Sequence, residues 1–303
     1  GPCRIGAEMA YGQLGRPAMT ILAFSVVLFS ALLHASWNLV AKKAGGGPGF
    51  VCLFSAMALF LLAPAAWISA LGMGTVSFSA YRLVLVSALC EAGYYLSLQK
   101  AYGKGDLSVI YPVARSTGPL VTVLVAPLFL GEELGGLALA GTALVLAGNL
   151  LLVTGKRHDG EKSPWGGVCF GLLAGFCIAG YTLVDKTAVS RHSLPPVLYF
   201  WAVLLLQTVF IAPLALAGRE NLKAAWTLHR REAFIIAVLS SASYILILWV
   251  LSFSPVSRIA PCREVGIVFG VCMGALFLGE RGFRGRLTAS AAVFAGILLL
   301  FAS

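Results

Sequence analysis

The sequence predicts an all-α integral membrane protein with ten transmembrane helices, arranged as two inverted repeats of five helices. Three observations lead to this fold class. Of the 303 residues, 59% are hydrophobic and only 11% are charged, whereas soluble domains carry about 25% charged residues. Apolar runs of about 20 residues, the length that crosses the hydrocarbon core of a bilayer, recur along the chain. The second half of the chain also repeats motifs of the first half in the same order.

Short segments with glycine, proline or charges separate the apolar runs, among them KKAGGGPG, GEELG and GERGFRGR. Such segments end helices and connect neighbouring spans. The predicted spans cover residues 20–41, 49–71, 81–102, 107–130, 134–154, 166–187, 195–217, 233–252, 257–278 and 285–302. The chain is therefore expected to be a multi-pass protein of a plasma or inner membrane.

These spans divide the chain into four parts. Residues 1–18 are polar and lack the apolar core of a signal peptide, so they are expected to be a disordered leader or a segment foreign to the native protein. Residues 19–155 form the first five-helix repeat, and residues 166–303 form the second. A polar linker, residues 156–165, joins the two repeats.

The internal repeat is visible as a constant offset of 148 residues between two long segments. The segments that begin ARSTGPLVTV and CREVGIVFGV both contain LFLGE, and their alignment places Arg115 over Arg263 and Gly148 over Gly296. Earlier in each half, WNLVAKK lies over YTLVDKT. Because five spans is an odd number, the second copy enters the membrane upside down. Inverted repeats are typical of secondary transporters, which bind substrate near the midplane between the halves.

These motifs also resemble those of a known family. LLHASWNLVAKK, PVAR followed by LFLGEEL, and APCREVGIVFG followed by LFLGERG are similar to the EamA-type branch of the drug/metabolite transporter superfamily. The resemblance covers the chain from Met19 onward. It implies a ten-helix carrier of small metabolites, often an exporter of amino acids or related compounds. It also implies that both termini are cytoplasmic.

The basic residues predict the opposite orientation. Most Lys and Arg residues fall in loops that follow odd-numbered spans, whereas Lys186 and Arg258 are among the few assigned to the other side. Because cytoplasmic loops are enriched in Lys and Arg, this distribution places both termini outside. The orientation and the direction of transport stay open at this point.

Four charged residues lie well inside the predicted spans: Glu91, Arg115, Arg263 and Glu264. An unpaired charge at the centre of a membrane helix costs about 2.5–3.5 kcal/mol. The four residues are therefore expected to pair with one another or to face a polar cavity. Each arginine follows a proline by two or three residues, so both are expected beside a helix irregularity near the repeat interface.

Two interpretations of the arginines stay open. Arginine presents a planar fork of donors that suits a carboxylate or phosphate, so Arg115 and Arg263 would bind the anionic group of a substrate. Alternatively, Arg115 pairs with Glu91, and Arg263 pairs with Glu264 or another acid, and these pairs only fix the helix packing. Both interpretations hold if an ion pair of one state opens for the substrate in another.

Glu91 is the candidate for a coupling proton, because a carboxyl group buried in a membrane helix can take up and release one. The equivalent residue of the second repeat is Ser240, so the carboxyl group is present in one half only. A fixed ion pair with Arg115 is the alternative role.

Four further residues are candidates for lining the substrate cavity. Trp37 and Asn38 belong to the WNLVAKK motif, and Tyr95 and Tyr244 occupy equivalent positions in the two repeats. The alternative for the aromatic residues is a place in the interfacial belt, and for Asn38 a hydrogen bond between helices.

Other functional classes are disfavoured. The basic residues do not gather in one patch, so nucleic acid is not an expected partner. The seven cysteines form no CxxC or other metal-ligand spacing, and no hydrolase or metalloprotease motif is present, so neither cofactor nor enzyme activity is predicted. A secondary transporter that works by alternating access is the favoured function. The alternative is a membrane enzyme or a passive channel with the same buried charges. The expected partners are a small-molecule substrate, the lipid bilayer and a coupling proton, and the chain is expected to be a monomer or homodimer.

Overall fold

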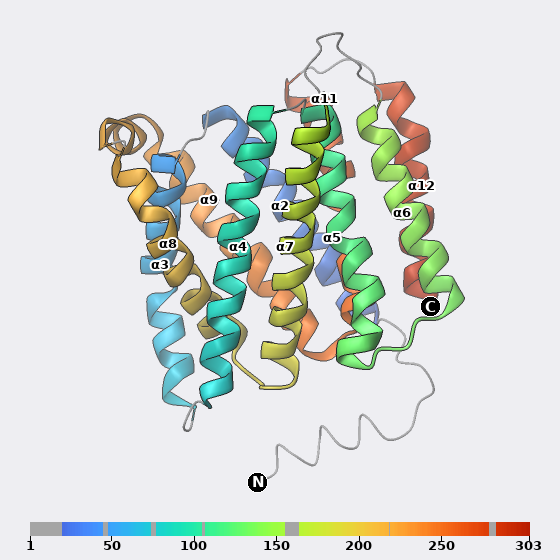
Figure 1. The fold of residues 1–303 in the computed structure, drawn as a ribbon, viewed down its shortest axis with the longest axis horizontal. Helices are drawn as coiled ribbons and strands as arrows, with labels where there is room; N and C mark the ends of the chain where they lie inside the picture. The colour runs from blue at the N-terminus through green and yellow to red at the C-terminus, as the bar shows by residue number, and fades with distance from the viewer. Residues whose placement is uncertain are drawn as a thin grey trace.

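The structure, a computed structural model, describes residues 20–44, 48–73, 77–104, 107–154, 164–217, 219–278 and 283–303, which form a helical bundle (Figure 1). The predicted leader, residues 1–18, and most of the predicted linker lie outside the described residues. The helices are α2 (Ile21–Ala44), α3 (Pro48–Leu71), α4 (Phe78–Lys104), α5 (Leu107–Leu130), α6 (Gly136–Thr154), α7 (Pro164–Ser190), α8 (Pro196–Ala217), α9 (Arg219–Phe253), α10 (Val256–Cys262), α11 (Val265–Leu278) and α12 (Phe283–Ala302).

The outer surface of this bundle suits lipid rather than water. Six helices (α2, α3, α5, α7, α8 and α9) are long and apolar enough to cross a membrane, and α6 and α12 contain shorter apolar stretches. Large apolar side chains point outward, for example Phe60 and Leu128, which are 82% and 81% exposed. The buried positions are instead rich in alanine and serine. Small residues let membrane helices approach closely, because lipid tails satisfy the large apolar side chains equally well.

The ninth predicted span, residues 257–278, is broken into two helices. α10 ends at Cys262, directly after Pro261, and α11 begins at Val265. Proline has no amide hydrogen to continue the helical hydrogen bonds, which explains a break at this position. Arg263 and Glu264 form the connection between the two helices.

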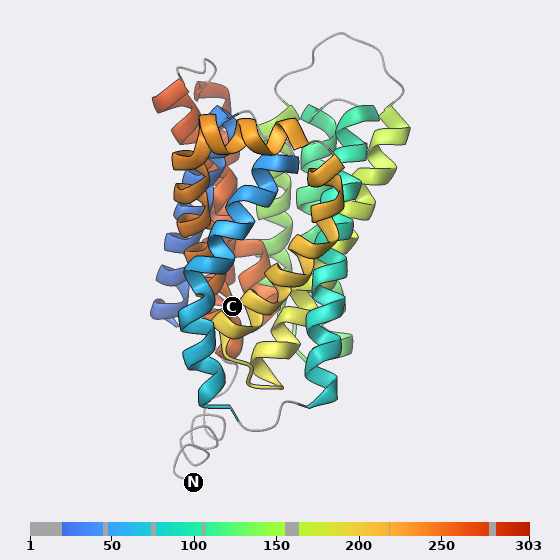
Figure 2. The ribbon, with the colours of Figure 1, turned by 90° about the vertical axis from the view of Figure 1, so that its left-hand side faces the viewer.

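α9 is longer than the predicted span 233–252. It begins at Arg219, and the backbone leaves helical geometry at His229 (φ −130°, ψ 21°). The part before the kink runs across the end of the bundle, roughly perpendicular to the other helices (Figure 2). Only the part after His229 follows the direction of a membrane span.

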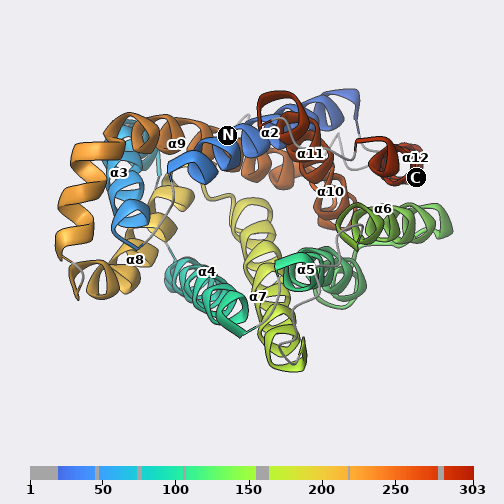
Figure 3. The ribbon, with the colours of Figure 1, turned by 90° about the horizontal axis from the view of Figure 1, so that it is seen from above.

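Helix contacts occur in matching sets. α4 packs against α7 as α9 packs against α2, and α3 packs against α9 as α8 packs against α4. α5 contacts α7 as α11 contacts α2, while α3 packs on α8 and α6 packs on α12. Figure 3 shows the α6–α12 pair at one side of the bundle and the α3, α8 and α9 group at the other. The matching contacts are related by exchanging α2 with α7, α3 with α8, α4 with α9, α5 with α10–α11, and α6 with α12.

Two glycines bring α6 and α12 into backbone contact. A Cβ atom at Gly148 would lie 2.8 Å from the oxygen of Ala289 and 2.7 Å from a methyl carbon of Val293. A Cβ atom at Gly296 would lie 2.6 Å from the oxygen of Gly141 and 2.8 Å from a methyl carbon of Val145. The residues of the two contacts differ by the same 148 positions that align the repeats.

Candidate functional site

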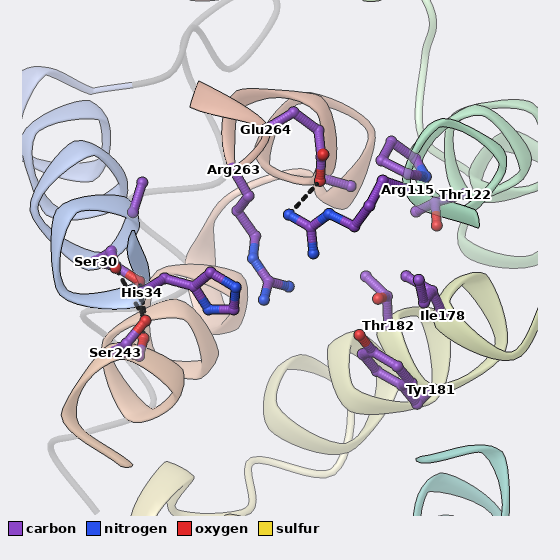
Figure 4. Close-up of a pocket in the computed structure, with 13 residues that line it drawn as sticks. Ser30, His34, Arg115, Thr122, Ile178, Tyr181, Thr182, Ser243, Arg263 and Glu264 are labelled. Carbon is purple, nitrogen blue, oxygen red and sulfur yellow. Dashed lines mark hydrogen bonds and ion pairs between the residues drawn. The ribbon is translucent and has the colours of Figure 1, made fainter. Parts of the chain in front are cut away.

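A polar cavity lies where α2, α5, α7 and α9 meet the α10–α11 break (Figure 4). Its volume is about 30 Å³, which is enough for a water molecule but far below the about 300–1,000 Å³ of typical ligand sites. The polar side chains that line it are Ser30, His34, Arg115, Thr122, Tyr181, Thr182, Ser243, Arg263 and Glu264. The structure therefore describes a narrow state of a polar site between the two halves.

An ion pair joins the halves at this cavity. Nη2 of Arg115 lies 3.2 Å from Oε1 of Glu264, and the side chain of Glu264 is only 5% exposed. The sequence interpretation that Arg263 pairs with Glu264 is corrected here, because Arg115 of the first half holds that carboxylate. The second carboxylate oxygen, Oε2 of Glu264, is buried and has no hydrogen-bond partner within the described part of the chain. It is thus an acceptor available to a small molecule in the cavity.

Both arginines point their guanidinium groups into the cavity (Figure 4). The central carbon of the Arg263 guanidinium lies 5.9 Å from the ring centroid of Tyr244, and the described residues contain no carboxylate within ion-pair distance of Arg263. Two like charges directed at one small space repel each other, and an anion between them removes that repulsion. The charged side chains that line the cavity are thus two guanidinium groups and one carboxylate among the described residues.

The helix break positions the second arginine but not the first. Arg263 and Glu264 occupy the turn between α10 and α11, so both side chains leave the break toward the cavity. Arg115 instead lies within α5, which continues as helix from Leu107 to Leu130. The expected helix irregularity is thus confirmed in the second half and corrected in the first.

A buried carboxylate that sequence analysis missed lies next to the cavity. Asp185 on α7 is 2% exposed, and its Oδ1 accepts hydrogen bonds from Ser87 at 2.6 Å and Tyr199 at 2.7 Å. Tyr244 donates to the other oxygen, Oδ2. Asp185 lies two residues before the end of the predicted span 166–187, a position at which an acidic residue is expected to lie at the membrane surface. The apolar run that continues beyond it, to the end of α7 at Ser190, is the signal that would have revealed it.

Comparison with known proteins fits this arrangement. Residues 165–302 match the EamA-like transporter family. The second half of the chain is therefore similar to that family. The uncharacterized protein PA1977 of Pseudomonas aeruginosa (strain PAO1) is 32% identical over 190 residues, which span 60% of this chain and 61% of the relative. A solved crystal structure with 15% sequence identity covers 91% of this chain and 95% of its own, with a TM-score of 0.69, and this shows the fold alone.

The match of the second half to the EamA-like transporter family, together with the six helices long and apolar enough to cross a membrane, indicates a multi-pass protein of the cell membrane. The family consists of transporters rather than enzymes, which disfavours the membrane-enzyme alternative. Within the described residues, no group of three histidine, cysteine, aspartate or glutamate side chains is placed to hold a metal ion.

The remaining predicted site residues lie at different distances from the cavity. Glu91 on α4 is buried, and Asp185, Tyr244 and Arg263 are close enough to act on its charge. Tyr244 links the two regions, because it donates to Asp185 and lies beside Arg263. Tyr95 is half-buried on α4 and does not line the cavity. The structure thus brings Glu91 and Tyr244 to the edge of the site.

The WNLVAKK residues lie further out. The ring of Trp37 is half-buried and lies 5.0 Å from the ring of His34, which itself lines the cavity. Asn38 is exposed, and its side-chain amide donates at 2.7 Å to the carbonyl of His34 on the same helix. His34, singled out in the sequence only as part of a polar stripe, is the member of this group that reaches the cavity.

Two basic residues assigned to loops are instead buried inside the helical bundle, which corrects the count of basic residues in loops. Nζ of Lys186 donates to the carbonyls of Leu251 at 2.8 Å and Ser254 at 3.0 Å, at the end of α9. Arg258 on α10 donates through Nη2 to the carbonyl of Ser303 at 2.7 Å. The ends of helices carry unpaired carbonyls that attract positive charge, so both residues serve as caps rather than as orientation signals.

The LFLGE motif also caps a helix end. The two carboxylate oxygens of Glu132 accept hydrogen bonds from the amides of Val256 at 2.8 Å and Ser257 at 2.9 Å, at the start of α10. The first amides of a helix lack internal partners and favour a negative charge. Because Glu132 lies in the first half and α10 in the second, this cap ties the halves together at the end of the bundle where α7 and α9 end.

Proposed function

We propose that the protein is a secondary transporter of a small polar metabolite with a negatively charged group, bound between Arg115 and Arg263. The observation that carries the proposal is that guanidinium groups of both halves point into one cavity, while among the described residues Arg263 has no carboxylate within ion-pair distance. A substrate anion supplies the missing negative charge. It also competes with Glu264 for Arg115, which weakens the contact between the halves.

The proposed architecture is ten transmembrane helices in two inverted repeats, with α10 and α11 as one broken span. The matching helix contacts and the equivalent Gly148 and Gly296 contacts support it. A twofold relation between five-helix halves requires opposite orientations in the membrane. Alternating access follows if one half rocks against the other around the cavity, whose volume of about 30 Å³ must grow to admit a metabolite.

An amino acid fits the proposed site as well as an organic anion does. Its carboxylate would lie between the arginines, and its ammonium group would donate to Oε2 of Glu264, the buried acceptor described above. Export is the direction that the family resemblance implies.

The proposed coupling group is Glu91. Asp185 accepts three hydroxyl donors, an arrangement that favours its ionised form because an ionised carboxylate is an acceptor only. Two neighbouring buried carboxyl groups resist simultaneous ionisation, so Glu91 is the group that holds a proton.

Transport into proteoliposomes tests the proposal. The panel comprises amino acids, organic acids, phosphonic acids and organic cations, each measured with and without a proton gradient. Saturable flux of an acid or amino acid is expected in the wild type, and it should vanish in Arg263→Ala. Arg191→Ala, which removes an exposed arginine at the end of α7, is the matched control and should transport normally. Flux of cations alone, or acid flux that survives Arg263→Ala, would reduce Arg263 to a packing residue. Flux without saturation would favour the channel alternative.

A further inference from the structure

The kinked start of α9 forms a second feature that transport does not explain. The helix has 35 residues and would be about 50 Å long if straight, whereas the hydrocarbon core is about 30 Å thick. The segment before His229 therefore turns across the end of the bundle (Figure 2). The His229 ring packs edge-on against Phe50 with centroids 6.0 Å apart, and Ala225 and Ala233 are buried on either side of the kink. This contact packs the kink against the start of α3.

A groove of about 460 Å³ opens on the outer side of this kink. Its walls come from α9 and α3, and they consist of Met57, Trp226, Arg230, Arg231, Phe234 and Ile235. Trp226 and Phe234 are each 54% exposed, and both arginines are exposed as well. The groove thus combines an apolar floor that faces the membrane with two adjacent positive charges at its rim.

We propose that this groove binds an anionic phospholipid, with the phosphate at Arg230 and Arg231 and an acyl chain along Phe234 and Ile235. Guanidinium groups match phosphate oxygens in geometry and charge, and basic pockets beside membrane helices suit anionic headgroups. Trp226 occupies the headgroup level, where tryptophan is enriched. No acidic side chain lines the groove among the described residues, so its charge is not neutralised from within.

One arginine near a helix end would be explained by extension of its side chain toward water. Two consecutive arginines cannot share one direction on a helix, since neighbouring residues point about 100° apart. Both nevertheless line the same groove, because it wraps around the kink. A single phosphate in the groove can therefore contact both guanidinium groups. Bound lipid would also hold the orientation of α9, the helix that carries Tyr244 to Asp185.

Fluorescence quenching by brominated lipids tests this site without any transport substrate. The purified protein is mixed with brominated phosphatidylglycerol or brominated phosphatidylcholine, and the signal of Trp226 is isolated by subtracting that of Trp226→Phe. The expected preference for phosphatidylglycerol is about fivefold for each arginine. It should disappear in the double variant Arg230→Gln/Arg231→Gln and persist in Arg191→Gln.

Equal quenching of Trp226 by both lipids in the wild type, or an unchanged preference in the double variant, would overturn the proposal. Loss of the preference on addition of inorganic phosphate at constant ionic strength would also overturn it, because the site would then be one for free phosphate. Each single variant, Arg230→Gln and Arg231→Gln, is measured as well, so that a folding defect of the double variant leaves the test intact. A transport defect has no influence on this result.

Discussion

Replacing Gly148 or Gly296 by alanine places a methyl group where the backbones of α6 and α12 touch. The new carbon would lie 2.8 Å from a carbonyl oxygen at Gly148 and 2.6 Å from one at Gly296, whereas unstrained contacts lie at about 3.5–4.0 Å. The groups it meets include backbone atoms, which cannot rotate away as a side chain does. Overpacking of this kind costs about 1–3 kcal/mol.

Helix propensity acts in the opposite direction, because alanine stabilises a helix by about 1 kcal/mol relative to glycine. The net expectation for each of the two variants is a loss of up to about 2 kcal/mol, which lowers the apparent Tm by up to about 8 °C. Gly270 in α11 has no atom within 4 Å of an added Cβ, so Gly270→Ala should raise the Tm. The measurement is the loss of helical circular dichroism on heating in detergent.

The comparison also tests the repeat. Because the contacts of Gly148 and Gly296 are equivalent at an offset of 148 residues, the two variants should lose stability by the same amount within about 0.5 kcal/mol. If Gly148→Ala stabilises as Gly270→Ala does, α6 and α12 do not touch at this point. If only one of the two variants is destabilised, the halves are not related by the twofold exchange.

Two further changes address the polar contacts. Asp185→Asn replaces an acceptor of three hydroxyl hydrogen bonds by an amide that has one acceptor oxygen. A loss of about 2–4 kcal/mol in the free energy of unfolding is therefore expected in the same melting assay, together with loss of proton-driven substrate accumulation. An unchanged Tm would contradict the hydroxyl contacts. Glu132→Gln leaves one of the two amides at the start of α10 without an acceptor. It should lower the free energy of unfolding by about 1–2 kcal/mol. Glu133→Gln changes the exposed carboxylate next to it and should leave the Tm unchanged. Equal Tm values for these last two variants would show that the cap does not join the halves.

Much of the helical framework could be predicted from the sequence. The long apolar runs required helices, because an unpaired backbone cannot lie in lipid, and the predicted spans agree with the helices within a few residues at most ends. The exceptions have local causes. Pro261 breaks the ninth span, and the kink at His229 separates a surface segment from α9. Charges in an apolar run likewise singled out Arg115, Arg263 and Glu264, which the structure brings to one cavity.

Tertiary structure decided which groups pair. From the sequence, Glu264 could form an ion pair with either Arg115 or Arg263. The packing of α5 against α10 brings Arg115 to it. Asp185 and Lys186 lie near a predicted span end, where hydropathy does not distinguish a buried residue from an interfacial one. Their hydrogen-bond partners belong to other helices, far away in sequence. The sequence by itself determined which segments enter the membrane and which charges they carry, because apolar length and charge are properties of a single segment. The partner of each charge is a property of two or more segments, and only their packing fixed it.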